Sequence, residues 1–64
     1  MANNQVIKQE SKFYKAADVA EILGVSETTA YRIIRSLNEE LKKQGKIVVA
    51  GKISKRFFEE KVVI

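Results

Sequence analysis

A chain of 64 residues has room for one domain with a small core, and a separate catalytic domain is not expected. It contains neither cysteine nor histidine, which excludes disulfides, thiolate or imidazole metal ligands, a cysteine nucleophile and an imidazole base, so we expect neither an enzyme nor a cofactor or metal site. The formal net charge of +4 favours a polyanionic partner.

Residues 1–12 are predicted to form a flexible arm, because they are polar apart from Val6 and Ile7. A single domain is expected over residues 13–64, with a short strand possible near Phe13 and Tyr14. No apolar run approaches the roughly 20 residues of a membrane span, and the start of the chain lacks the pattern of a signal peptide. We therefore expect a cytoplasmic protein with no membrane partner.

The first predicted helix begins at Ala16, where apolar residues recur at helical spacing as far as Leu23. Gly24 follows at the position where a residue with positive φ can end a helix. The helix is therefore expected to be short and to end in a tight turn.

The second predicted helix starts after Ser26, whose hydroxyl can accept from a backbone N–H of the first turn, while Glu27 suits the helix dipole. It is expected to run to Gln44, with Gly45 just beyond its end. One apolar stripe follows its length, made of Ala30, Ile33, Ile34, Leu37 and Leu41.

A β-hairpin is predicted next, with strands at residues 46–49 and 52–54 around a tight turn at Ala50 and Gly51. Because alanine is a poor residue for positive φ, we expect a type I turn with Gly51 as a left-handed bulge. Ser54 can then cap a third helix that runs to Lys61.

Two adjacent aromatic residues, Phe57 and Phe58, lie on this third helix. Aromatic side chains can stack on the bases of a single strand. In so short a chain packing is the stronger interpretation, and we expect at least Phe57 to close the core, as Tyr14 also would. The expected partners of Phe57 are Ile47, Val49 and Ile53.

The strongest functional signal is the spacing of small and apolar residues around Gly24. Helices that cross at roughly 100° need a small residue where they approach, and Ala20 supplies it. Val25 can fill the angle between the helices, while Ala30 and Ile33 place the second helix against the first. This spacing predicts a helix-turn-helix.

The stretch from Tyr14 to Ser26 (YKAADVAEILGVS), with TTAYRII at residues 28–34, resembles the excisionase-type helix-turn-helix, a family related to the winged helices of MerR-type regulators. Residues 51–58 (GKISKRFF) resemble its wing and closing helix. The resemblance implies a mainly α winged helix-turn-helix with a small β-hairpin, in the order helix, helix, hairpin wing, short helix. Lys15 departs from the family, which usually has a capping Thr or Ser there, and the second helix is longer than in the shortest excisionases.

The exposed face near the start of the second helix is the expected base-reading surface, because this end of a helix-turn-helix enters the major groove. Arg32 or Arg35 could bond to guanine, and Thr28 could touch a thymine methyl group or a phosphate. Glu27 could accept from cytosine. A solvated helix face is the alternative. The candidate residues are Ser26, Glu27, Thr28, Tyr31, Arg32 and Arg35.

Residues 42–56 are the second candidate surface, because they are rich in lysine and contain no acidic residue. A narrow hairpin tip can approach a minor groove while its basic residues neutralise phosphates. Lysines that protect an exposed sheet edge from aggregation are the alternative. The candidate residues of this wing are Lys46, Gly51, Lys52, Lys55 and Arg56.

These surfaces predict a sequence-specific protein for double-stranded DNA. The resemblance leaves two roles open: an excisionase, that is, a recombination directionality factor, or a small transcriptional regulator of a mobile element. One domain reads a short site, so we expect monomers on repeated sites or a weak homodimer, with a recombinase (integrase) or RNA polymerase as a further partner. A module that binds such a partner without reading DNA is the alternative, and it would expose a large apolar patch.

Overall fold

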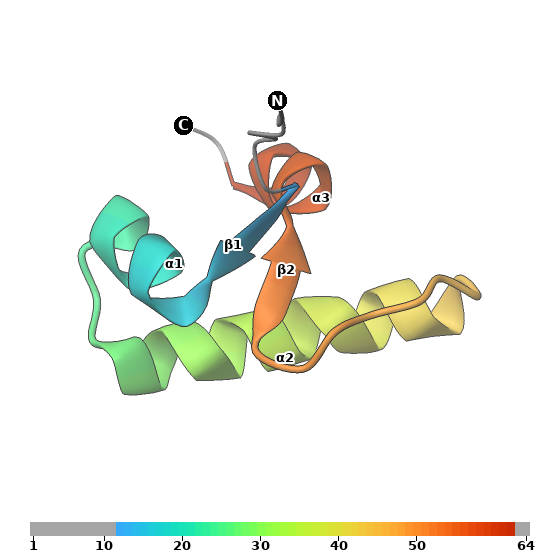
Figure 1. The fold of residues 1–64 in the computed structure, drawn as a ribbon, viewed down its shortest axis with the longest axis horizontal. Helices are drawn as coiled ribbons and strands as arrows, with labels where there is room; N and C mark the ends of the chain where they lie inside the picture. The colour runs from blue at the N-terminus through green and yellow to red at the C-terminus, as the bar shows by residue number, and fades with distance from the viewer. Residues whose placement is uncertain (1–11, 63–64) are drawn as a thin grey trace, which may run out of the picture.

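A computed structural model describes residues 12–62, in which three helices surround a two-stranded sheet. α2 is the long base of the molecule, and α1, the sheet and α3 lie on one side of it (Figure 1). The predicted winged helix-turn-helix class is confirmed, while nearly all of the predicted arm lies outside the described residues. The elements in chain order are β1 (Phe13–Lys15), α1 (Ala16–Leu23), α2 (Glu27–Lys43), β2 (Lys52–Ser54) and α3 (Lys55–Lys61).

α1 begins directly after β1 without a capping hydroxyl at Lys15. Asp18 compensates from the first turn, since its carboxylate accepts from the backbone N–H of Lys15 at 2.9 Å and satisfies a donor at the helix start. The helix ends at Gly24 as predicted, with φ of 70°. The Gly24 N–H donates to the carbonyl oxygen of Ala20 at 2.8 Å, so the backbone itself fixes the corner.

Replacing Gly24 with alanine should weaken the fold through backbone strain. An added Cβ would meet nothing within 4 Å, but a left-handed φ costs an L residue about 1 kcal/mol. We expect that loss in the free energy of unfolding, measured by chemical denaturation. Gly24→Asn should lose less, because asparagine tolerates the left-handed region. Equal losses for the two variants would show that φ does not decide the effect.

α2 is capped at both ends as predicted. The Ser26 hydroxyl accepts from the backbone N–H of Thr29 at 3.2 Å. At the other end the Lys46 N–H donates to the carbonyl oxygen of Leu41 at 2.9 Å, and Gly45 takes a left-handed φ just beyond the helix. These are the features of a Schellman motif, and they turn the chain back along α2.

The partner of β2 differs from the prediction. Residues 46–49 form no strand, and β2 pairs antiparallel with β1, so that Tyr14 lies opposite Ile53 and Lys15 opposite Lys52. A tight turn is present at Ala50 and Gly51, because the Lys52 N–H donates to the carbonyl oxygen of Val49 at 3.1 Å. The predicted type I geometry with a following bulge is wrong, since Gly51 occupies the third position of the turn with a left-handed φ of 78°, as in a type II turn.

The side chain of Asn38 attaches the turn to α2. Its Nδ2 donates to the carbonyl oxygens of Val49 at 3.3 Å and Lys52 at 2.9 Å, so both ends of the turn are bonded to the helix. Ile47 is 93% exposed, and it therefore supplies no apolar face for a hairpin. We call residues 46–51 the wing loop.

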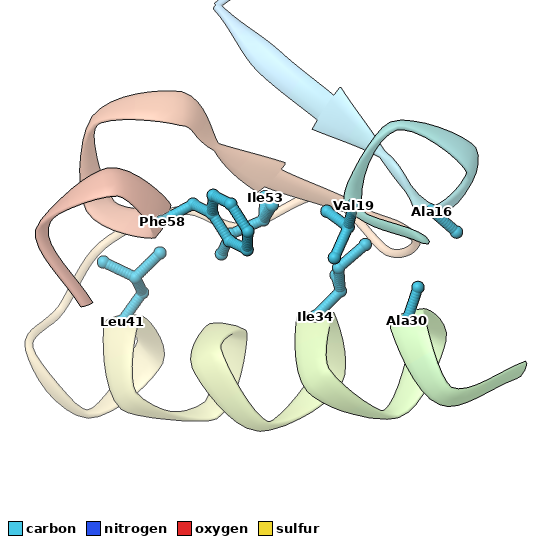
Figure 2. Packing of buried hydrophobic residues seen from close by; sticks show 7 residues of the cluster. All are labelled: Ala16, Val19, Ala30, Ile34, Leu41, Ile53 and Phe58. Carbon is cyan, nitrogen blue, oxygen red and sulfur yellow. The ribbon is translucent and has the colours of Figure 1, made fainter. Parts of the chain in front are cut away.

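The core lies between α2 and the elements that cover it (Figure 2). Ile33 and Leu37 of the predicted stripe are only half-buried, and Ile22 of α1 is 41% exposed. Asn38 is buried although it is polar. The buried apolar residues are Ala16, Val19, Ala30, Ile34, Leu41, Ile53 and Phe58.

Phe58, and not Phe57, closes the core. The Phe58 side chain is fully buried, whereas Phe57 is half-buried, because α3 begins directly after β2 and its phase turns Phe58 toward α2. Of the partners predicted for Phe57, Ile53 is buried in the core, while Ile47 and Val49 are exposed.

Tyr14 packs on the core, as predicted. Its ring meets Phe58 edge to face, with the ring centroids 5.4 Å apart. The hydroxyl donates to the Glu59 carboxylate at 2.8 Å, and this hydrogen bond raises the pKa of the Tyr14 phenol. The two contacts connect β1 to α3.

Candidate nucleic-acid interface

The start of α2 projects from the corner with α1, and its outer side is open to solvent (Figure 1). The Ser26 hydroxyl is already engaged, since it accepts from the Thr29 N–H and donates to the Thr29 Oγ1 at 3.1 Å. Tyr31 is 54% exposed although it is a large aromatic residue. We call the exposed set the recognition face: Ser26, Glu27, Thr28, Tyr31, Arg32 and Arg35.

The wing loop returns along α2 and brings its turn beside the recognition face (Figure 1). A Cβ added to Gly51 would lie 3.5 Å from the Cε1 atom of Tyr31, so the turn and the tyrosine ring are neighbours. A groove lies between α2 and the loop, and Arg35 and Ala50 both line it. The turn therefore lies beside two of the base-reading candidates, Tyr31 and Arg35.

The lysine next to this turn has a cationic neighbour. Lys52 lies opposite Lys15 in the sheet, and residues paired in this way point to the same side. Ile53, the next residue of β2, is buried, so successive side chains alternate and both lysines point away from the core. Two exposed lysine side chains therefore leave the same side of the sheet at its end nearest the wing turn.

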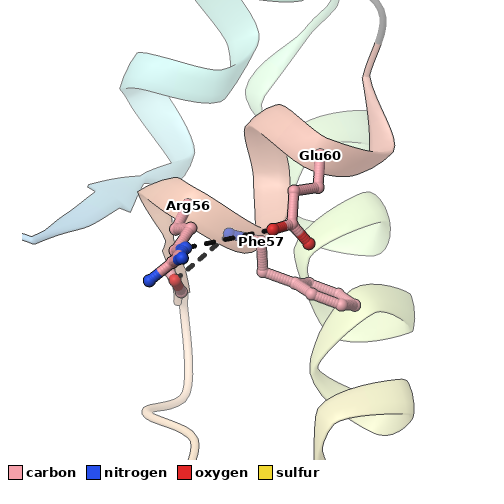
Figure 3. A network of polar contacts seen from close by, with 4 residues as sticks. Arg56, Phe57 and Glu60 are labelled. Atoms are coloured by element: carbon pink, nitrogen blue, oxygen red, sulfur yellow. Dashed lines mark hydrogen bonds and ion pairs between the residues drawn. The ribbon is translucent and has the colours of Figure 1, made fainter.

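The other basic candidates of the wing lie elsewhere. Lys46 and Arg56 line a second groove, beside Phe57 and the C-terminal end of α2. Arg56 also makes an exposed ion pair with Glu60 within α3, with Nε and Oε2 3.9 Å apart (Figure 3). The five wing candidates predicted from the sequence thus do not form one surface.

Lys55 is separated from the turn as well. Its ammonium nitrogen lies 5.3 Å from the centroid of the Tyr14 ring, a cation–π contact at the junction of β1 and α3. Of the predicted wing residues, only Gly51 and Lys52 lie beside the turn at the recognition face.

Sequence reasoning missed two residues that lie beside the wing turn, Lys15 and Asn38. Lys15 shows no signal in the sequence, because its proximity to Lys52 depends on a strand pairing between distant segments. Asn38 did carry a signal, since it lies four residues after Ile34 and three before Leu41 and therefore falls on the buried stripe. A polar residue at such a position usually has a hydrogen-bonding role.

No group of three or more acidic, histidine or cysteine side chains in residues 12–62 could hold a metal ion. Within the same stretch, no helix has both the length and the apolar character needed to cross a membrane.

Comparisons with known proteins show the family of this chain. A family model described as a helix-turn-helix domain matches residues 13–63. The ICEBs1 excisionase of Bacillus subtilis (strain 168) is 43% identical over 51 residues, which cover 80% of this chain and 80% of that protein. No solved structure matches the chain significantly. The family match includes every helix and strand described above.

Proposed function

This chain belongs to the excisionase-type helix-turn-helix family, and from that premise we propose that it is an excisionase that binds double-stranded DNA. One observation carries the proposal: the start of α2 is exposed and lies beside the wing turn, with Tyr31 against Gly51. A helix end and a loop on one face can contact neighbouring grooves of a duplex together.

Base reading is assigned to the recognition face. Arg32 and Arg35 present guanidinium groups suited to a bidentate contact with guanine, and Thr28 can contact a thymine methyl group or a phosphate. Glu27 can accept from cytosine. Ser26 acts mainly as the helix cap, since its hydroxyl already bonds to Thr29.

Phosphate binding is assigned to Lys52 and Lys15, with Gly51 allowing the backbone to come close. Like charges that face each other across a sheet repel, and this repulsion is relieved when a phosphate lies between them. Lys46, Lys55 and Arg56 have a smaller part in this proposal, because they lie at the second groove or on Tyr14.

The similarity to an excisionase favours a role in recombination over one in transcription. The proposed partner besides DNA is therefore the recombinase of a mobile element, and the proposed place of action is the cytoplasm. Monomers on repeated sites and a weak homodimer remain the two modes of binding. Titration of duplexes carrying one or two sites, with sedimentation of the free protein, distinguishes them.

Salt dependence tests the proposed function directly. Duplexes that bind are selected from a random library, and the affinity is measured by gel shift at increasing salt. Log affinity should fall with log salt by about 0.9 for each phosphate contacted, so several contacts give a steep line. No duplex binding at low salt, or affinity independent of salt, would contradict the proposal.

A further inference from the structure

Asn38 is a buried polar residue on the long helix that carries the recognition face. Only 8% of its surface is exposed, and it lies on the side of α2 that holds Ile34 and Leu41 in the core. An amide removed from water is costly unless its hydrogen bonds are replaced. The structure therefore has to provide partners for it.

Those partners are the two ends of the wing turn. The Nδ2 group has two hydrogens, and two carbonyl oxygens lie within reach: that of Val49 at 3.3 Å and that of Lys52 at 2.9 Å. Both neighbours are acceptors, which also determines that the nitrogen and not the oxygen of the amide faces the turn. One side chain of α2 thus holds both the first and the last residue of the turn.

Tyr31 and Asn38 lie two helical turns apart on α2, and the wing turn touches both. The ring of Tyr31 lies against Gly51 in the middle of the turn, while Asn38 bonds to its two ends. The Lys52 backbone is therefore bonded directly to the helix that carries Arg32 and Arg35. The pairing of β2 with β1 holds Lys52 in the sheet, but it does not attach the turn to α2.

We propose that Asn38 is a positioning residue for DNA binding, which holds the wing turn at a set distance from the recognition face through its two hydrogen bonds. The inference rests on the proposed function. A turn fixed before DNA arrives lets Lys52 reach a phosphate without a further ordering cost, while the recognition face occupies the major groove. Without the amide, the recognition face and the pairing of β1 with β2 remain, but the turn that leads into Lys52 loses its attachment to α2.

Two variants separate this role from simple stability. Asn38→Leu removes both hydrogen bonds but continues the apolar stripe, so the helix stays packed. Asn38→Asp keeps the shape and replaces the donor with an acceptor that faces two carbonyl oxygens. Ser36→Ala, at an exposed site of the same helix, is the matched control. Circular dichroism and titration of the active fraction ensure that only folded protein is compared.

The affinity for the selected duplex is measured at about 50 and about 200 mM salt, and the first value is divided by the second. Each phosphate contact raises this ratio about 3.5-fold. Lys52→Ala should reduce this ratio about 3.5-fold in the wild-type background. Asn38→Leu alone should produce about the same reduction, and Lys52→Ala added to it should change little. Asn38→Asp should behave like Asn38→Leu, and Ser36→Ala like the wild type.

A full effect of Lys52→Ala in the Asn38→Leu background would overturn the inference, because the turn would then be positioned without the amide. That result leaves the proposed function intact, since the wild type still binds DNA in a salt-dependent way. If the wild type itself binds no duplex at low salt, the proposed function fails and this inference fails with it.

Discussion

Phe58→Ala should lower the free energy of unfolding by about 3–5 kcal/mol, the largest effect expected of any single substitution in this protein. The Phe58 side chain is fully buried and is one of the largest buried groups. It fills the space between α3 and α2 beside Leu41 and Ile53 (Figure 2). Removing the ring leaves a cavity that these neighbours can only partly fill.

Loss on this scale matters because a small domain has a total stability of about 5 kcal/mol or little more. Thermal and urea denaturation followed by circular dichroism measure the change. Phe57→Ala is the matched control, since this neighbouring phenylalanine is only half-buried and should lose clearly less. A greater loss for Phe57→Ala would show that α3 presents its other side to α2.

Arg32→Ala should weaken binding to the selected duplex by about 1–3 kcal/mol and change binding to random DNA much less. Arg32 is exposed, so its loss leaves the core intact. A bidentate contact is made only with the correct base, and the loss therefore falls on specific binding. Lys52→Ala should weaken binding to both duplexes by similar factors, because every sequence presents phosphates.

Competition gel shifts with the selected and a scrambled duplex measure both effects. Arg56→Ala serves as a basic control, because Arg56 is also exposed but pairs with Glu60 beside the second groove. Its effect should be small on either duplex. If Arg32→Ala and Lys52→Ala each reduced the affinity for both duplexes by equal factors, the proposed division between base reading and phosphate binding would be wrong.

The ends of the helices follow from the sequence alone. Ser26 and Ser54 cap α2 and α3 through bonds to the backbone three residues ahead, and Gly24 ends α1 with a left-handed φ. These interactions join residues within one turn, so their spacing is readable without any tertiary contact. For the same reason, the spacing of Ala20, Gly24 and Val25 predicted the helix-turn-helix corner. It also predicted that the start of α2 is exposed.

Tertiary structure decided whatever depends on distant segments. β2 could have paired with residues 46–49, but its partner is β1, at the other end of the described chain, and this pairing places Lys15 beside Lys52. Asn38 bonds to both ends of the wing turn and so attaches this part of the chain to α2, another contact between distant segments. Residue spacing does not specify which of two adjacent phenylalanines faces α2, or which cations share a surface, because both depend on how separate elements pack.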